Sequence, residues 1–276
     1  MIITDLALAD IRLHIASHRP ERGGALYGPK GQFAVTHFEF DAEGATSAVS
    51  YVPSRRLIDN VRAVELQTGL QLKGIVHSHP LGFAKPSQGD IQTVQSFFRL
   101  NPHFSRMELP IVQQIGANEP QDSAGYIKWF NAARGAELAS AFGLGSVTSN
   151  KGPSVEIISD DLFVIPLLKD ANELAQSLAS RGIDLKVDPK VQHLKIQNAS
   201  LIGLVARNDQ MQEFMFFVGF DYPVMPPVVL YQEEGNTCQL EFIWNGLEHR
   251  NKALQNIAVA LFNKLRVGGV VAIPSP

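Results

Sequence analysis

The chain has 276 residues, of which 45% are hydrophobic and 18% are charged, and its formal net charge is −3. This composition is typical of a globular protein, excludes an intrinsically disordered chain, and lacks the basic blocks of a nucleic-acid-binding protein. The length predicts about two domains. Cys238 is the only cysteine, so no intrachain disulfide can form. Without a signal peptide or an apolar run of about 20 residues, the sequence predicts a cytoplasmic protein with no membrane span.

The first part of the sequence alternates between helix-like and strand-like patterns. Residues 5–17 favour a helix that stops at Pro20, because proline cannot continue it. Residues 23–28 combine glycines with a short apolar run, which predicts a strand whose backbone is closely approached. Residues 32–40 alternate as a second strand does. Residues 54–68 predict a helix that begins at a serine cap and has one apolar face.

Strands and helices continue to alternate through the next segment. Residues 72–79 predict a strand, and Asp90 opens a helix after a loop that contains glycine and proline. Two further strands are predicted over residues 109–115 and 125–130. Strands interleaved with helices in this way predict an α/β sandwich.

A linker is predicted over residues 142–154, which are rich in glycine, serine and threonine. It separates a first domain, residues 1–145, from a second domain, residues 155–276. The second domain begins with a helix over residues 167–180 and ends with a helix whose apolar residues share one face. Strand-like runs lie between them, over residues 193–197, 201–207, 213–220 and 228–231. Helix, meander and helix predict a smaller α+β domain.

The candidate chemistry lies in the stretch His77-Ser-His-Pro-Leu-Gly-Phe-Ala-Lys-Pro-Ser-Gln-Gly-Asp90. Successive side chains of a strand alternate between faces, so His77 and His79 project to the same side and can reach one ion. The loop can bring Asp90 back as a third ligand. Two histidines, one carboxylate and one open position describe a catalytic zinc site.

A hydrolytic zinc site also needs a general base that is not a ligand, and Glu21 is the candidate. Ser87 is a small donor that could stabilise an oxyanion. Ordinary alternatives exist for each residue. A His-x-His pair is often structural, Ser87-x-x-Asp90 is also a variant of a helix capping box, and Glu21 near a turn could be a solvated charge. The capping box is compatible with ligation, since a capped helix start can position a ligand.

The joint pattern resembles the JAB/MPN (JAMM) metalloprotease family, in which a glutamate precedes H-[ST]-H-x7-S-x2-D. The stretch Glu21-Arg-Gly-Gly-Ala-Leu-Tyr-Gly, then His77-Ser-His79, Ser87 and Asp90, matches every position. For the first domain, the resemblance implies a central sheet between helices and a zinc peptidase or isopeptidase. It implies that His77, His79 and Asp90 hold Zn²⁺, that Glu21 is the acid/base, and that Ser87 supports the tetrahedral intermediate. Family members commonly cleave after the C-terminal glycine of ubiquitin-like proteins, and some hydrolyse other amides.

The second domain resembles ubiquitin-conjugating enzymes more weakly. Residues 216–228 look like a strand followed by the family's YPxxPP turn, and Cys238 follows where that family places its thioester cysteine. Two features depart from the family pattern: the segment between turn and cysteine is short, and the preceding His-Pro-Asn motif is missing. We interpret Cys238 as a packed strand residue and the domain as an inactive, partner-binding relative.

The sequence as a whole predicts a zinc-dependent isopeptidase that hydrolyses an amide bond after the C-terminal glycine of a ubiquitin-like protein. Its expected partners are a ubiquitin-like protein or its conjugate, and the activating or conjugating enzymes of that pathway. One alternative is a non-catalytic scaffold that binds ubiquitin-like proteins. Another is a bifunctional enzyme that also uses Cys238 for conjugation.

Overall fold

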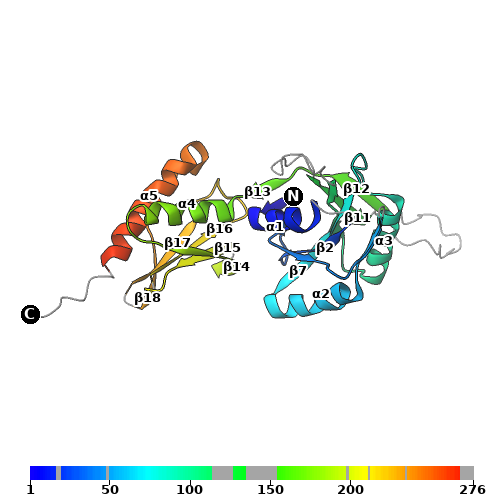
Figure 1. Cartoon of the computed structure of the whole chain (residues 1–276), viewed down its shortest axis with the longest axis horizontal. Coiled ribbons are helices and arrows are strands. Elements are labelled where there is room, and N and C mark those ends of the chain that lie inside the picture. The colour runs from blue at the N-terminus through cyan, green and yellow to red at the C-terminus, as the bar shows by residue number, and fades with distance from the viewer. Residues whose placement is uncertain are drawn as a thin grey trace, which may run out of the picture. The chain divides into compact units, whose positions relative to one another are not determined.

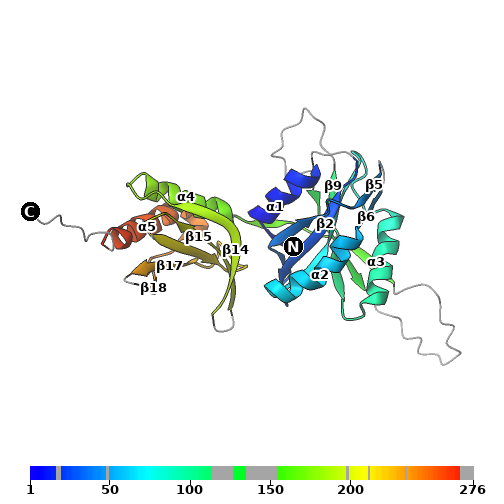
Figure 2. The ribbon, with the colours of Figure 1, turned by 60° about the horizontal axis from the view of Figure 1, so that its bottom comes forward.

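The computed structural model describes residues 1–16, 20–47, 50–113, 127–134, 154–196, 199–210, 212–233 and 235–267. The protein has a mixed α+β fold and divides into two compact units (Figures 1 and 2). Unit 1 comprises Met1 and Ala7–Phe163, and unit 2 comprises Ile2–Leu6 and Val164–Pro276. Most of the predicted linker, residues 142–153, lies outside the described residues. None of the described helices is long and apolar enough to cross a membrane.

Unit 1 is built on an eight-stranded sheet with β7 (Leu70–His79) at its centre. β7 runs antiparallel to β2 (Gly23–Pro29) and parallel to β8 (Arg106–Glu108) and β9 (Ile111–Gln113). The remaining strands of this sheet are β4 (His37–Phe40), β10 (Ile127–Lys128), β11 (Phe130–Arg134) and β12 (Val155–Ser159).

Two sequence-based boundaries in unit 1 need correction. The predicted strand over residues 32–40 is interrupted at Thr36, so it forms β3 (Ala34–Val35) and β4 separately. The predicted division placed β12 in the second domain, whereas β12 lies in unit 1 because it pairs antiparallel with β11. A separate hairpin consists of β5 (Ala45–Ser47) and β6 (Ser50–Val52).

Helices cover both faces of the unit 1 sheet (Figure 2). On one face lies η1 (Arg12–Ala16), a π-helical turn that continues α1 (Asp5–Ile11) and contacts β7 and β9. On the other lie α2 (Arg55–Thr68), which packs Leu57 against Tyr27, and α3 (Gln88–Leu100), which packs Phe98 against Met107. The range of α2 confirms the predicted helix. Ser54 accepts a hydrogen bond from the Leu57 N–H at 3.0 Å, and Gly69 ends the helix in the left-handed region.

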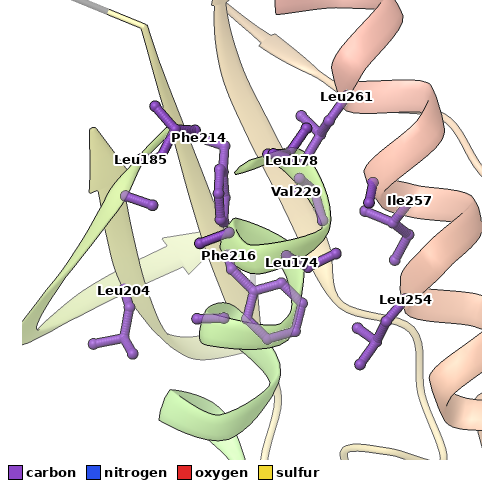
Figure 3. Close-up of a cluster of buried hydrophobic side chains, with 14 of the residues drawn as sticks. Leu174, Leu178, Leu185, Leu204, Phe214, Phe216, Val229, Leu254, Ile257 and Leu261 are labelled. Atoms are coloured by element: carbon purple, nitrogen blue, oxygen red, sulfur yellow. The ribbon is translucent and has the colours of Figure 1, made fainter. Parts of the chain in front are cut away.

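Unit 2 is an antiparallel meander of five strands packed against two helices. The strands are β14 (Lys186–Ile196), β15 (Ala199–Arg207), β16 (Glu213–Val218), β17 (Val228–Glu233) and β18 (Asn236–Gln239). The helices are α4 (Leu167–Ala179) and α5 (Gly246–Val267). Figure 3 shows Leu254, Ile257 and Leu261 of α5 directed at Phe214, Phe216 and the leucines of α4, which confirms the predicted apolar face.

The N-terminal residues belong to unit 2 through two long-range contacts. β1 (Ile2–Thr4) pairs with β13 (Phe163–Ile165). The carboxylate of Asp5 accepts hydrogen bonds from the backbone N–H groups of Leu168 and Lys169 at the start of α4, at 3.0 and 2.9 Å. Because Pro166, the N-cap of α4, makes no side-chain capping bond, Asp5 serves as the cap instead.

Candidate metal centre and its cavity

The two predicted histidine ligands lie at the C-terminal end of the central strand β7. His77 has Gly23 of β2 and Ile111 of β9 as its cross-strand partners, so neighbouring strands cover it on both sides. His77 is 4% exposed and His79 is 6% exposed. Their Nε2 atoms face each other at 2.9 Å. The alternation of a strand therefore brings the two imidazoles to one point, as the sequence predicted.

Asp90 reaches the same point from the first turn of α3. Ser87 is the N-cap of this helix: its Oγ accepts from the Asp90 N–H at 3.2 Å, and Asp90 Oδ2 accepts from the Ser87 N–H at 2.6 Å. This capping box fixes the carboxylate, whose Oδ1 lies 3.1 Å from His77 Nε2 and whose Oδ2 lies 3.4 Å from His79 Nε2. Asp90 therefore takes part in the capping box of α3 and approaches the two histidines at the same time.

The three side chains have the geometry and chemistry that a divalent metal requires. Among the described residues, His77, His79 and Asp90 form the group whose ligand atoms all lie within 4.8 Å of one another. Ligands about 2.0–2.1 Å from a tetrahedral zinc lie about 3.3 Å apart, close to the separations of 2.9, 3.1 and 3.4 Å. His79 Nδ1 lies 3.1 Å from the Phe83 carbonyl oxygen, which orients the ring and leaves Nε2 for an ion. Nitrogen and carboxylate donors suit zinc.

The charge of Asp90 is favoured by its neighbours. Burial alone would raise the pKa of this carboxyl, but the hydrogen bonds with His77 and His79 outweigh burial and hold the pKa well below its usual range. Asp90 is therefore ionised across the physiological pH range, as a metal ligand must be.

Glu21 lies two residues before the start of β2 and is 2% exposed, so the alternative of a solvated glutamate is wrong. Its backbone N–H donates to the Ser47 carbonyl at 3.1 Å, and the adjacent Arg22 exchanges backbone and hydroxyl bonds with Ser78 of β7. Burial raises the pKa of Glu21 above its usual value, against the opposing charges of His79 and His77. Glu21 stands outside the three-residue ligand group and borders the same cavity.

A cavity of about 510 Å³ opens beside these residues. Its walls include Glu21, His79, Asp90 and Ser87, together with the loop that connects β7 to α3. Phe83 in this loop is 68% exposed. The arrangement can place a substrate carbonyl next to a metal, a buried carboxylate and a hydroxyl.

Sequence reasoning missed Tyr51 and Asp41. The close approach predicted at the glycines of residues 23–28 is made by the protein itself. A Cβ on Gly23 would lie 2.3 Å from the Tyr51 ring, and one on Gly24 would lie 2.1 Å from the Glu39 carbonyl oxygen. The glycines at the start of β2 were a sequence signal of close approach, but the approaching group is Tyr51.

Cys238 lies in β18 of unit 2, with Tyr231 as its cross-strand partner. Its side chain is partly buried and packs against the core of that unit. The likeness of unit 2 to ubiquitin-conjugating enzymes stays a prediction.

Comparison with known proteins relates this chain to one domain family. Residues 5–119 match the family described as prokaryotic homologs of the JAB domain. A Desulfitobacterium hafniense protein solved in solution is 16% identical, with coverage of 60% of this chain and 94% of its own and a TM-score of 0.36. A JAB1/MPN domain protein from Archaeoglobus fulgidus is 17% identical, with coverage of 60% and 99% and a TM-score of 0.31. No curated protein matches. The matched residues 5–119 include the whole candidate metal centre, so the similarity to prokaryotic homologs of the JAB domain covers this site.

Proposed function

We propose that unit 1 is a zinc-dependent amide hydrolase whose ligands are His77, His79 and Asp90. The observation that carries the proposal is the convergence of these three side chains beside a buried glutamate and an open cavity. A structural zinc site would use four protein ligands, whereas three ligands and a cavity leave a position for chemistry. The match of residues 5–119 to prokaryotic homologs of the JAB domain supports the same conclusion.

Each protein group has a distinct task in the proposed reaction. Bound zinc would supply a Lewis acid and an activated water. Glu21 takes a proton from the attacking water and delivers it to the leaving amine, and burial raises its pKa above the usual value, which favours acceptance of the proton. The Oγ of Ser87 accepts from the Asp90 N–H, so its own hydrogen stays available for the substrate oxyanion.

The proposed substrate is the C-terminal tail of a ubiquitin-like protein in amide linkage to an amine. Such a tail is extended and can bind by adding a strand beside a sheet edge, as exposed peptides commonly do. The cavity lies between the β5–β6 hairpin, which contributes Ser50, Tyr51 and Val52, and the loop that carries Phe83. With Tyr51 packed over Gly23 on one wall, small residues fit best next to the scissile bond.

Metal analysis and a cleavage assay test the proposal together. The purified protein and a His103→Ala control should carry about one zinc, whereas His77→Ala and Asp90→Ala should lose both zinc and activity. Peptide amides that follow Gly-Gly should be cut faster than amides that follow bulky residues. Zinc retained in His77→Ala, or a zinc-free wild-type protein, would favour the alternative of a non-catalytic scaffold for ubiquitin-like partners.

A further inference from the structure

Tyr51 is an aromatic residue that lies against the candidate metal centre. It belongs to β6, and its ring stacks on the imidazole of His77 with a centroid distance of 6.3 Å and an interplanar angle of 21°. Different contacts orient the rings of His77 and His79. The second ring nitrogen of His79 bonds the Phe83 carbonyl, but within the described part of the chain no equivalent bond to His77 Nδ1 is present. On the side away from His79 and Asp90, the orientation of the His77 ring therefore depends on packing.

A buried carboxylate holds Tyr51 in place. The Tyr51 hydroxyl donates to Asp41 Oδ2 at 2.9 Å, and the same oxygen accepts from the Ser54 N–H at 2.7 Å. Asp41 Oδ1 accepts from the Glu43 N–H at 3.3 Å. Hydrogen bonds to a charged acceptor are roughly twice as strong as neutral ones, so this anchor restricts the ring more than packing alone would.

The backbone is shaped around the same ring. A Cβ on Gly23 would lie 2.3 Å from Tyr51, and a Cβ on Gly44 would lie 2.6 Å from its opposite edge. Neither glycine needs its freedom for a left-handed turn, because neither is among the glycines with positive φ. Contact with Tyr51 is what makes a larger residue unfavourable at both positions.

We propose that Tyr51 is a positioning residue, which holds His77 with its Nε2 directed at His79 and Asp90 and is itself held by Asp41. The inference rests on the metal site of the proposed function. Tyr51 orients the His77 ring as the Phe83 carbonyl orients the His79 ring, but it uses an aromatic face in place of a hydrogen bond. Groups that orient a metal ligand typically change metal affinity about 10- to 100-fold when they are removed.

The test compares Tyr51→Ala and Tyr51→Phe with Tyr27→Phe, a matched control. Tyr27 is a buried tyrosine of the same unit whose hydroxyl donates to Glu39 at 2.8 Å, away from the cavity. Affinity for Co²⁺ is measured by competition with a chromophoric chelator, and ligand geometry by the visible absorption of the bound Co²⁺. Tyr51→Ala should bind Co²⁺ about 10- to 100-fold more weakly than the wild type and should show an altered absorption spectrum. Tyr51→Phe should lose Co²⁺ affinity by a smaller factor. Tyr27→Phe should match the wild type in both measurements.

The outcomes separate this inference from the proposed function. Wild-type protein that binds no Co²⁺ would overturn the metal site itself. If the wild type binds Co²⁺ and Tyr51→Ala keeps the same affinity and spectrum, only the role of Tyr51 would be overturned. Where Tyr51→Ala fails to fold, Tyr51→Phe gives the answer, since it keeps the ring and removes only the bond to Asp41. Equal losses of Co²⁺ affinity in Tyr51→Phe and Tyr27→Phe would also refute the proposal.

Discussion

Glu21→Gln tests the proposed division between a general base and the metal ligands. The substitution keeps the shape of a side chain that is 2% exposed and removes only its ability to accept a proton. Because His77, His79 and Asp90 form the ligand group without Glu21, zinc should stay bound at the wild-type level. Loss of the negative charge should not destabilise the folded protein, because burial already disfavours the ionised form of Glu21 and raises its pKa.

The expected loss of rate follows from the task assigned to Glu21. A positioned acid/base group contributes about 10²- to 10⁴-fold, which corresponds to about 2.7–5.5 kcal/mol of the activation barrier. The assay measures kcat/KM on a Gly-Gly amide and zinc content on the same preparation. Glu39→Gln is the control, because Glu39 is a partly buried carboxylate of unit 1 that bonds Tyr27 and Asn60 and does not line the cavity. Loss of zinc together with rate would show that Glu21 is a ligand, and an unchanged rate would show that it is not the base.

Two further predictions concern unit 2. Burial, opposed by the bond from Tyr222 and the charge of Arg250, raises the pKa of Asp170 to about 6. Because the folded state then holds the proton more tightly than the unfolded state, the free energy of unfolding should fall as pH rises from about 4 to 6, by up to about 3 kcal/mol. Chemical denaturation at a series of pH values should show this slope flattened in Asp170→Asn, and an identical slope would contradict the assignment. Cys238→Ala should leave cleavage of a ubiquitin-like fusion within about twofold, because the candidate metal centre lies in unit 1 and hydrolysis by a metal-activated water needs no cysteine nucleophile. Incubation with a charged activating enzyme should give no reducible adduct on the wild type, and an adduct that disappears in Cys238→Ala would establish the bifunctional alternative.

Local sequence rules predicted the elements that carry the candidate ligands. The serine cap of α2 and the capping box of α3 act over three or four residues, so they could be recognised directly. The alternation of a strand placed His77 and His79 on one side for the same reason. The spacing of apolar residues in α5 likewise predicted the face that packs on the unit 2 sheet.

Contacts between distant segments could not be recognised in this way. Asp5 caps a helix that begins more than 160 residues later, and β12 returns across the predicted boundary to pair with β11. Nothing in the residues around Glu21 distinguishes a solvated carboxylate from the buried one that the structure contains. The glycine at position 23 signalled a close approach but not the identity of the approaching ring.

The amino-acid sequence by itself therefore specified the types and spacing of the candidate ligands, the capped helix that presents Asp90 and the α+β class of both halves. These properties depend on side-chain chemistry and on periodicities of two and 3.6 residues, which are local. The burial of Glu21, the cavity beside it and the anchoring of Tyr51 by Asp41 became evident only in the folded chain. They depend on which strands and loops meet after the chain closes over long separations, and no local rule encodes that choice.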